Sequence, residues 1–185
     1  VAHSYDVRVR RWLASYPETT GYIIPTLYDY AMHFDAPEYR EPARKMALWE
    51  VKEQLPDGGI RAGTMDAEVV APTIFNTGQV LFGLARAALE TDDESIRAAL
   101  ERAADWLVSA QDDDGCWRKF PSPFTTTKTA TYNTRCAFGL LRAFTVVPKQ
   151  TYLDAADRNV KWALGESRPN AWLPGNCLVH QPNDS

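Results

Sequence analysis

The sequence predicts an all-α protein that forms part of an α/α toroid and contains about three helical hairpins. Two observations predict this fold: similar segments recur along the chain, and apolar residues within each repeat have helical spacing. The recurring segments begin at Thr20, Thr77 and Thr134, so both steps are 57 residues (77−20 and 134−77). We therefore expect a partial toroid with a 57-residue period.

A second landmark recurs in the same way. Turn sequences begin at Gln54, Gln111 and Glu166, in steps of 57 and 55 residues (111−54 and 166−111). Agreement between two independent landmarks makes chance similarity a poor explanation of the period. We expect a single domain over residues 1–185, with repeats at about 20–60, 77–117 and 134–172.

Each repeat is expected to hold two helices. In the second repeat, two apolar stripes follow the i, i+3, i+4 rule. They contain Val80, Leu81, Leu84 and Ala85, and then Ile96, Leu100, Ala103 and Leu107. The segment TDDES from Thr91 separates them and suits a helix N-terminus, because its side chains accept hydrogen bonds from free amides. The first helices hold more small apolar residues, so we expect them inside and the charged second helices outside. No stretch alternates as a strand would.

Composition limits the partners. With 45% hydrophobic residues among 185, the chain can bury one sizeable core. The net charge of −4 arises from 24 acidic and 20 basic residues mixed along the chain, so nucleic acid is not an expected partner. No apolar run approaches the roughly 20 residues that span a bilayer, so no membrane is expected. Three cysteines, an odd number, indicate free thiols and predict a cytoplasmic location.

The segment AADWLVSAQDDDGCW, residues 103–117, resembles the QW motif of the terpenoid cyclase and protein prenyltransferase toroid superfamily. The resemblance implies that Gln111 caps open helix carbonyls, Gly115 permits the turn and Trp117 covers the joint between hairpins. Nearly the whole chain is similar to an uncharacterised group of bacterial prenyltransferase/squalene-oxidase-repeat proteins that accompany exopolysaccharide biosynthesis genes. That group is longer, so the chain is expected to be a fragment of a carbohydrate-associated toroid.

The starts of the three inner helices predict a site, because equivalent positions of a toroid ring one mouth of its cavity. A carboxylate, a phenol and a guanidinium there would bind sugar hydroxyls or a uronate, and Glu18 would act as acid or base. The candidate catalytic residues are Glu18, Tyr132 and Arg135. The candidate substrate-binding residues are Tyr22, Asn76, Gln79, Asn133 and Trp117. In the alternative interpretation, polar residues here only cap helices, namely Thr20, Asn76, Thr77, Asn133 and Thr134.

Other toroid chemistries fit less well. The sequence lacks the Asp-x-Asp-Asp motif that supplies the acid of terpene cyclases, because Asp112 to Asp114 belong to the turn and are followed by Gly115. Asp114, Cys116 and His180 are spaced as the zinc ligands of protein prenyltransferase β subunits, but a turn explains the first two equally well. The preferred hypothesis therefore includes no metal and no cofactor. The remaining alternative is a non-catalytic repeat scaffold for a protein partner.

The ends of a three-hairpin arc would leave apolar helix faces without neighbours. Such faces are rarely exposed on monomers, so a homodimer is expected.

Overall fold

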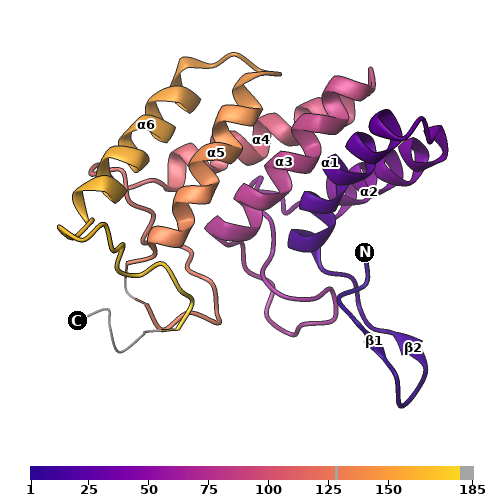
Figure 1. The fold of residues 1–185 in the computed structure, drawn as a ribbon, viewed down its shortest axis with the longest axis horizontal. Coiled ribbons are helices and arrows are strands. Elements are labelled where there is room, and N and C mark those ends of the chain that lie inside the picture. The colour runs from indigo at the N-terminus through magenta and orange to yellow at the C-terminus, as the bar shows by residue number, and fades with distance from the viewer. Residues whose placement is uncertain (128, 180–185) are drawn as a thin grey trace.

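A computed structural model describes residues 1–127 and 129–179. The described residues form six α-helices and two short 3₁₀ turns, Pro37–Tyr39 and Thr131–Asn133. The helices are α1 (Pro17–His33), α2 (Arg40–Glu53), α3 (Ile74–Glu90), α4 (Glu94–Ala110), α5 (Thr134–Phe144) and α6 (Gln150–Gly165). Helices α1, α3 and α5 pack side by side in one layer, and each pairs with the outer helix that follows it (Figure 1). The three predicted hairpins are confirmed.

The 57-residue period is visible in the helix boundaries. Helix α1 begins at Pro17, α3 at Ile74 and the 3₁₀ turn before α5 at Thr131, which gives two steps of 57 (74−17 and 131−74). Helices α1 and α3 therefore begin three residues before Thr20 and Thr77, whereas α5 begins at Thr134 itself, after the 3₁₀ turn. The prediction that these threonines are N-caps is wrong, because the N-cap residues are Tyr16, Thr73 and Asn133.

These threonines have a different structural role. The hydroxyl of Thr77 donates to the Thr73 carbonyl at 2.8 Å and accepts from the Ile60 amide at 2.9 Å. The Thr20 hydroxyl likewise donates to the Tyr16 carbonyl at 2.9 Å. Each side chain therefore bonds within its own helix, and Thr77 also ties the preceding loop to α3. At the start of α4, the expected capping of a free amide by an acidic residue is confirmed: the Asp93 side chain accepts from the Ser95 amide at 3.1 Å.

Glycines allow the inner helices to approach closely. A side chain at Gly83 would collide with the Gly21 carbonyl of α1, and one at Gly139 would collide with the Gly78 carbonyl of α3. Pro25 has no amide to donate to the Gly21 carbonyl four residues before it, so that carbonyl faces the Gly83 backbone instead. The inner layer is therefore packed backbone to backbone.

The outer layer is joined by a repeated side-chain bracket. The Gln54 amide donates to the Gly58 carbonyl of its own turn and to the Ala99 carbonyl of α4, both at 2.9 Å. Gln111 donates to Gly115 at 3.0 Å and to Ala155 of α6 at 2.9 Å. The resemblance implied that Gln111 caps open carbonyls at a helix C-terminus, whereas its acceptors are in its own turn and within the next outer helix. We call each of these glutamines, with its two acceptors, a glutamine bracket.

The connections divide between the two ends of the layers. Residues 34–39, 91–93 and 145–149 form short links at one end, whereas 54–73, 111–133 and 166–179 lie at the other (Figure 1). The long segments surround the starts of α1, α3 and α5, as the expected mouth requires. A two-stranded hairpin, β1 (Tyr5–Asp6) and β2 (Arg11–Trp12), projects from the same end. It was not predicted, because two-residue strands are too short to show alternation.

Candidate functional site

A hollow of about 390 Å³ lies on the inner helices, and we call it the arginine hollow. All three inner helices contribute to its wall. Its lining residues are Tyr22 and Pro25 of α1, Phe82 of α3, and Arg135, Phe138 and Arg142 of α5. Two of these six, Tyr22 and Arg135, were predicted from the helix starts.

Arg135 is held in position by the neighbouring helix. Its Nε donates to Oε1 of Gln79 at 2.6 Å, and its guanidinium lies 5.5 Å from the centroid of the Phe82 ring. Gln79 is only 1% exposed, so it supports Arg135 and does not itself face solvent. The predicted binding role of Gln79 is therefore indirect. Because Nε is engaged, the two terminal nitrogens of Arg135 remain available to a ligand.

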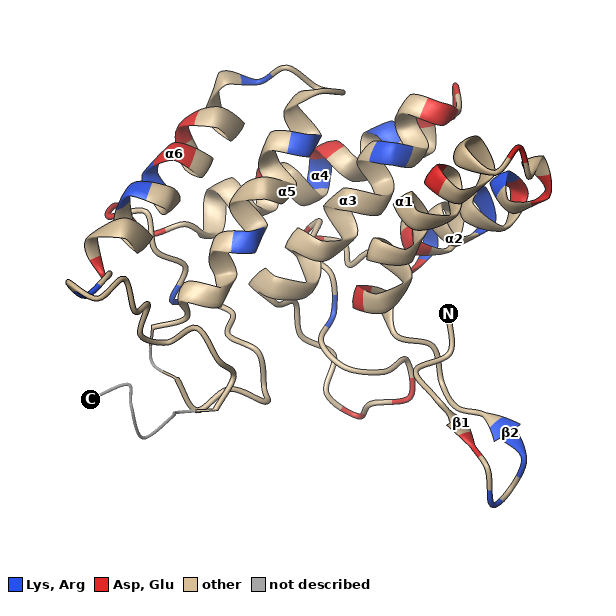
Figure 2. Cartoon of the chain, in the orientation of Figure 1, with Lys and Arg blue, Asp and Glu red and all other residues tan. Residues whose placement is uncertain are grey.

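The described lining of the arginine hollow contains two arginines and no carboxylate. The only charged residues of α5 are Arg135 and Arg142, and α5 is accordingly blue and tan in Figure 2. Among the described residues, neither arginine forms an ion pair, and the Arg142 guanidinium has no hydrogen-bond partner. Two unpaired guanidinium groups in one hollow favour an anionic ligand.

Tyr22 lines the arginine hollow and lies one helical turn after Glu18 on α1. Burial raises the pKa of Tyr22, the negative charge of Glu18 raises it further, and the positive charge of Arg135 lowers it. The three predicted residues therefore share one electrostatic environment. Tyr22 is 37% exposed, so its phenol is accessible from the hollow.

Glu18 itself lines a second cavity of about 180 Å³, which we call the polar pocket. Its lining residues are Tyr16, Glu18, Phe75, Asn76, Ser122, Phe124, Tyr132, Asn176 and Leu178. Burial raises the pKa of Tyr16, and the Glu18 carboxylate raises it further. Burial also raises the pKa of Tyr132, whose ring packs edge-on against Phe75 at 5.5 Å between centroids. Both phenols stay protonated at neutral pH and can donate hydrogen bonds.

Three predicted residues are buried and have structural contacts. Asn76 is 4% exposed, and its side chain donates to the Arg61 carbonyl at 2.9 Å, although it also borders the polar pocket. Asn133 is 2% exposed within the 3₁₀ turn and lines neither cavity. Trp117 is 2% exposed, and its indole N–H donates to the Leu107 carbonyl at 2.9 Å. These contacts favour the structural role that the motif resemblance implied for Trp117, and its predicted role in substrate binding stays a prediction.

Sequence reasoning missed four residues of the arginine hollow: Pro25, Phe82, Phe138 and Arg142. The repeat contained a signal for three of them, because Pro25, Phe82 and Phe138 are spaced by 57 and 56 residues (82−25 and 138−82). Arg142 lies seven residues after Arg135, which places both on one helix face. Pro25, Phe82 and Phe138 each lie one helical turn beyond a residue predicted from the helix starts.

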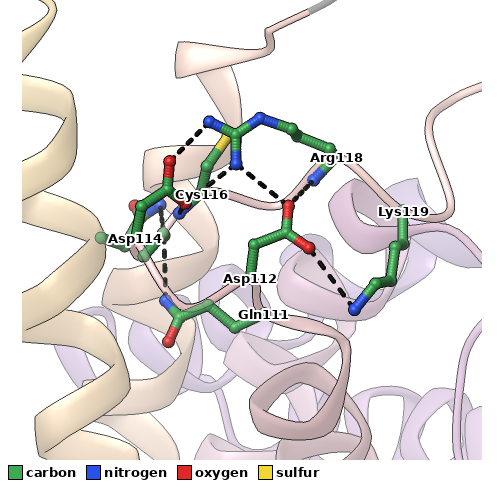
Figure 3. Close-up of polar contacts among 8 residues, drawn as sticks. Gln111, Asp112, Asp114, Cys116, Arg118 and Lys119 are labelled. Carbon is green, nitrogen blue, oxygen red and sulfur yellow. Dashed lines mark hydrogen bonds and ion pairs between the residues drawn. The ribbon is translucent and has the colours of Figure 1, made fainter.

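In the turn after α4, the two candidate zinc ligands Asp114 and Cys116 are an ion-paired carboxylate and a buried thiol. Arg118 reaches both Asp112 and Asp114, with distances of 2.8 and 2.6 Å to the two Asp114 oxygens (Figure 3). This guanidinium lowers the pKa of Asp114 to about 2, and burial raises the pKa of the fully buried Cys116 to about 11. His180 lies outside the described residues. Residues 1–127 and 129–179 contain no group of three His, Cys, Asp or Glu placed to hold a metal ion.

Within the same ranges, no helix has the length and apolar character needed to cross a bilayer.

Comparison with known proteins identifies structural relatives only. No family model matches the chain, and no curated protein matches it. Two crystal structures, each described as a possible member of the GH105 family, have a similar fold. The one from Salmonella enterica has a TM-score of 0.68, 16% identity, and coverage of 92% of this chain and 50% of its own. The one from Klebsiella pneumoniae has a TM-score of 0.70, 16% identity, and coverage of 92% and 49%.

The chain thus spans about half the length of these structures. The comparisons do not confirm the resemblance to prenyltransferase-repeat proteins or the link to exopolysaccharide. What they establish, together with the helical layers, is that the chain has the α/α toroid fold.

Proposed function

We propose that this chain is the carbohydrate-binding part of an α/α toroid and that it takes a saccharide bearing a carboxylate in the arginine hollow. The observation that carries the proposal is the pair of arginines, neither ion-paired among the described residues, beside three aromatic rings. The cationic groups suit a uronate, and the rings suit the apolar face of a sugar.

Arg135 is the proposed anchor for the carboxylate. A guanidinium and a carboxylate form two parallel hydrogen bonds when both planes are correctly oriented. Gln79 and Phe82 hold Arg135 from two sides, so little freedom is lost when a ligand binds. Arg142 adds a second positive charge to the same wall.

The aromatic residues define the shape of the proposed site. Tyr22, Phe82 and Phe138 each come from a different inner helix, and aromatic rings offer large apolar contact area at low entropic cost. A hollow of about 390 Å³ lies within the range of small-ligand sites, which is roughly 300–1,000 Å³. It would accommodate a saccharide residue and leave one side open for the next.

Glu18 is the proposed acid or base of any reaction at this site. Among the described residues that line the arginine hollow and the polar pocket, it is the only carboxylate. Glycoside hydrolysis ordinarily requires two carboxyl groups. We therefore propose binding as the function of this part of the toroid, with Glu18 acting alone or with a group from elsewhere in the protein.

The wider comparisons support a carbohydrate ligand. The two structural neighbours, as possible GH105 proteins, are glycoside hydrolase-like. The resemblance to proteins that accompany exopolysaccharide biosynthesis genes favours a polysaccharide or its precursor. A cytoplasmic location and the absence of a nucleic-acid partner remain predictions from composition.

Calorimetric titration with methyl β-D-glucuronide and methyl β-D-glucoside tests the proposal. We expect the glucuronide to bind and the glucoside to bind at least tenfold more weakly. Binding of the glucuronide should weaken as salt is added, because both arginines are solvent-accessible. Equal affinity for the two sugars would contradict the proposal.

A further inference from the structure

We propose that two mouth loops form a second binding site, which holds an apolar substituent carried by the saccharide. The ligand would then be an amphiphilic glycoside, a sugar joined to an alkyl, aryl or acyl group. This inference rests on the proposed function for the sugar, but the apolar site is argued from its own residues.

The site is a cavity of about 370 Å³ between loops 54–73 and 111–133, which we call the loop pocket. Its walls are almost wholly apolar and include Ala62, Val69, Ala71, Pro121, Pro123 and Phe124. The two loops are about one repeat apart in sequence, so the pocket is made by the packing of neighbouring hairpins. Its volume lies within the roughly 300–1,000 Å³ of small-molecule sites.

One polar group in the loop pocket lacks a partner. The Thr73 side chain lines the pocket, is 2% exposed, and its hydroxyl makes no hydrogen bond with the described residues. A buried hydroxyl without a partner is unfavourable. An ether or ester oxygen at the head of an apolar substituent would accept from it. The pocket therefore offers apolar walls and one side-chain hydroxyl that can donate, that of Thr73.

Internal hydrogen bonds hold the loop pocket open. The Arg61 guanidinium donates to the carbonyls of Met65 and Ala67, at 3.3 and 2.9 Å, and so braces the bend of the first loop. The Ala62 amide donates to the Ala71 carbonyl at 2.9 Å, which joins the two sides of the loop. These bonds preorganise the wall, so binding need not order it.

The loop pocket adjoins the polar pocket in two ways. Phe124 lines both cavities and so separates them by one side chain. Asn76, which borders the polar pocket, donates to the carbonyl of Arg61 at 2.9 Å, and Arg61 directly precedes Ala62 of the loop-pocket wall. A saccharide that extends from the arginine hollow past Tyr22 to Glu18 would place its substituent in the polar pocket, beside Phe124 and the entrance to the loop pocket. Glu68, exposed on the lining, would disfavour a free carboxylate there and favour a neutral group.

The test measures Kd for methyl β-D-glucuronide, octyl β-D-glucuronide and octyl β-D-glucoside by calorimetry below their micellar concentrations. We expect the octyl glucuronide to bind at least tenfold more tightly than the methyl compound, because burial of added methylenes is favourable. Ala71→Phe, which fills the loop pocket, should abolish this gain and leave the methyl compound unchanged. The matched control is Val70→Phe, since Val70 is 56% exposed and does not line the pocket.

A second variant covers the possibility that Ala71→Phe fails to fold. Phe124→Ala removes an exposed wall residue and should reduce the octyl gain at least threefold. An octyl gain that survives both variants overturns the inference, as does equal affinity of the wild-type chain for the methyl and octyl glucuronides. Failure of the proposed function has a different signature: the methyl glucuronide would not bind, while octyl glucoside would still bind in a manner abolished by Ala71→Phe.

Discussion

Arg135 of α5 donates from Nε to Oε1 of Gln79 of α3 at 2.6 Å, so a buried amide on one inner helix aims a guanidinium carried by the next. We predict that Gln79→Met lowers affinity for methyl β-D-glucuronide about tenfold, because Arg135 loses its orientation. The Gln79 Nε2 has no partner among the described residues, so its loss should leave the melting temperature within a few degrees of wild type. Calorimetry and thermal melting on the same samples check both parts, and a large fall in stability would identify Gln79 as merely structural.

Arg135→Ala and Arg142→Ala should each weaken glucuronide binding and reduce its salt dependence. Removal of one of two positive charges weakens attraction for the carboxylate, and we expect the larger loss, about a hundredfold, for Arg135. Neither variant should lower the melting temperature appreciably, since neither arginine has an ion-pair partner among the described residues. Arg97→Ala, an exposed arginine of outer helix α4, is the charge-matched control. Equal losses with Arg97→Ala would mean that only net charge matters.

Thr77→Ala should destabilise the chain by about 1–3 kcal/mol, because the buried Ile60 amide loses its acceptor. Thr77→Ser retains the hydroxyl and should recover most of the loss. Urea unfolding followed by circular dichroism measures both, with Thr26→Ala on an exposed face of α1 as the control. An unchanged unfolding midpoint for Thr77→Ala would show that the loop does not depend on this bond.

Glu50→Leu should stabilise the protein. Glu50 is fully buried, neither carboxylate oxygen has a partner among the described residues, and burial raises its pKa well above the usual value. The equivalent position one repeat later is Leu107 (107−50=57), which is also fully buried. We expect a gain of about 1–3 kcal/mol at pH 8.

The pH dependence of this effect has a definite sign. A carboxyl whose pKa is raised by folding contributes no penalty below its unfolded pKa, which is about 4.3. Stability then falls as pH rises through the interval up to the raised pKa. The advantage of Glu50→Leu should therefore be larger at pH 8 than at pH 4, as measured by urea unfolding at both. Glu41→Leu, on the exposed face of α2, should show no such difference.

The chain is predicted to self-associate. Large apolar side chains are exposed near both ends of the arc, including Met32 (64%) and Phe34 (62%) at one and Leu164 (66%) at the other. Two arcs related by a two-fold axis would cover these faces. Sedimentation equilibrium at micromolar concentration should give twice the 20.8 kDa chain mass. A species of 20.8 kDa, unaffected by Met32→Glu, would rule out the dimer.

The fold was predictable because its signal is repeated. A 57-residue period and helical apolar spacing are properties of the sequence itself, and both survive in the helix boundaries. The starts of α1 and α3 were misplaced by three residues because threonine is a frequent N-cap, whereas Thr20 and Thr77 donate to the carbonyls four residues before them from inside the first turn. Local sequence preference could not distinguish a hydroxyl that caps a helix from one that bonds to a carbonyl four residues earlier.

The site was only partly predictable. Glu18, Tyr22 and Arg135 were expected together and do share one environment. The burial of Trp117 could not be predicted from its own turn, because burial depends on the neighbouring helices. The hydrogen-bond partner of Gln111 could not be predicted from the local sequence either, because Ala155 lies 44 residues away in another helix.

Each glutamine bracket joins a turn to a helix that is synthesised later. Gln54 bonds to Ala99, 45 residues later, and Gln111 bonds to Ala155, 44 residues later. At about 5–20 residues per second on the ribosome, that delay is roughly 2–9 s. Until then each glutamine can bond only within its own turn, so every hairpin needs its successor before its last contact forms. The order in which hairpins become rigid therefore follows the order of translation.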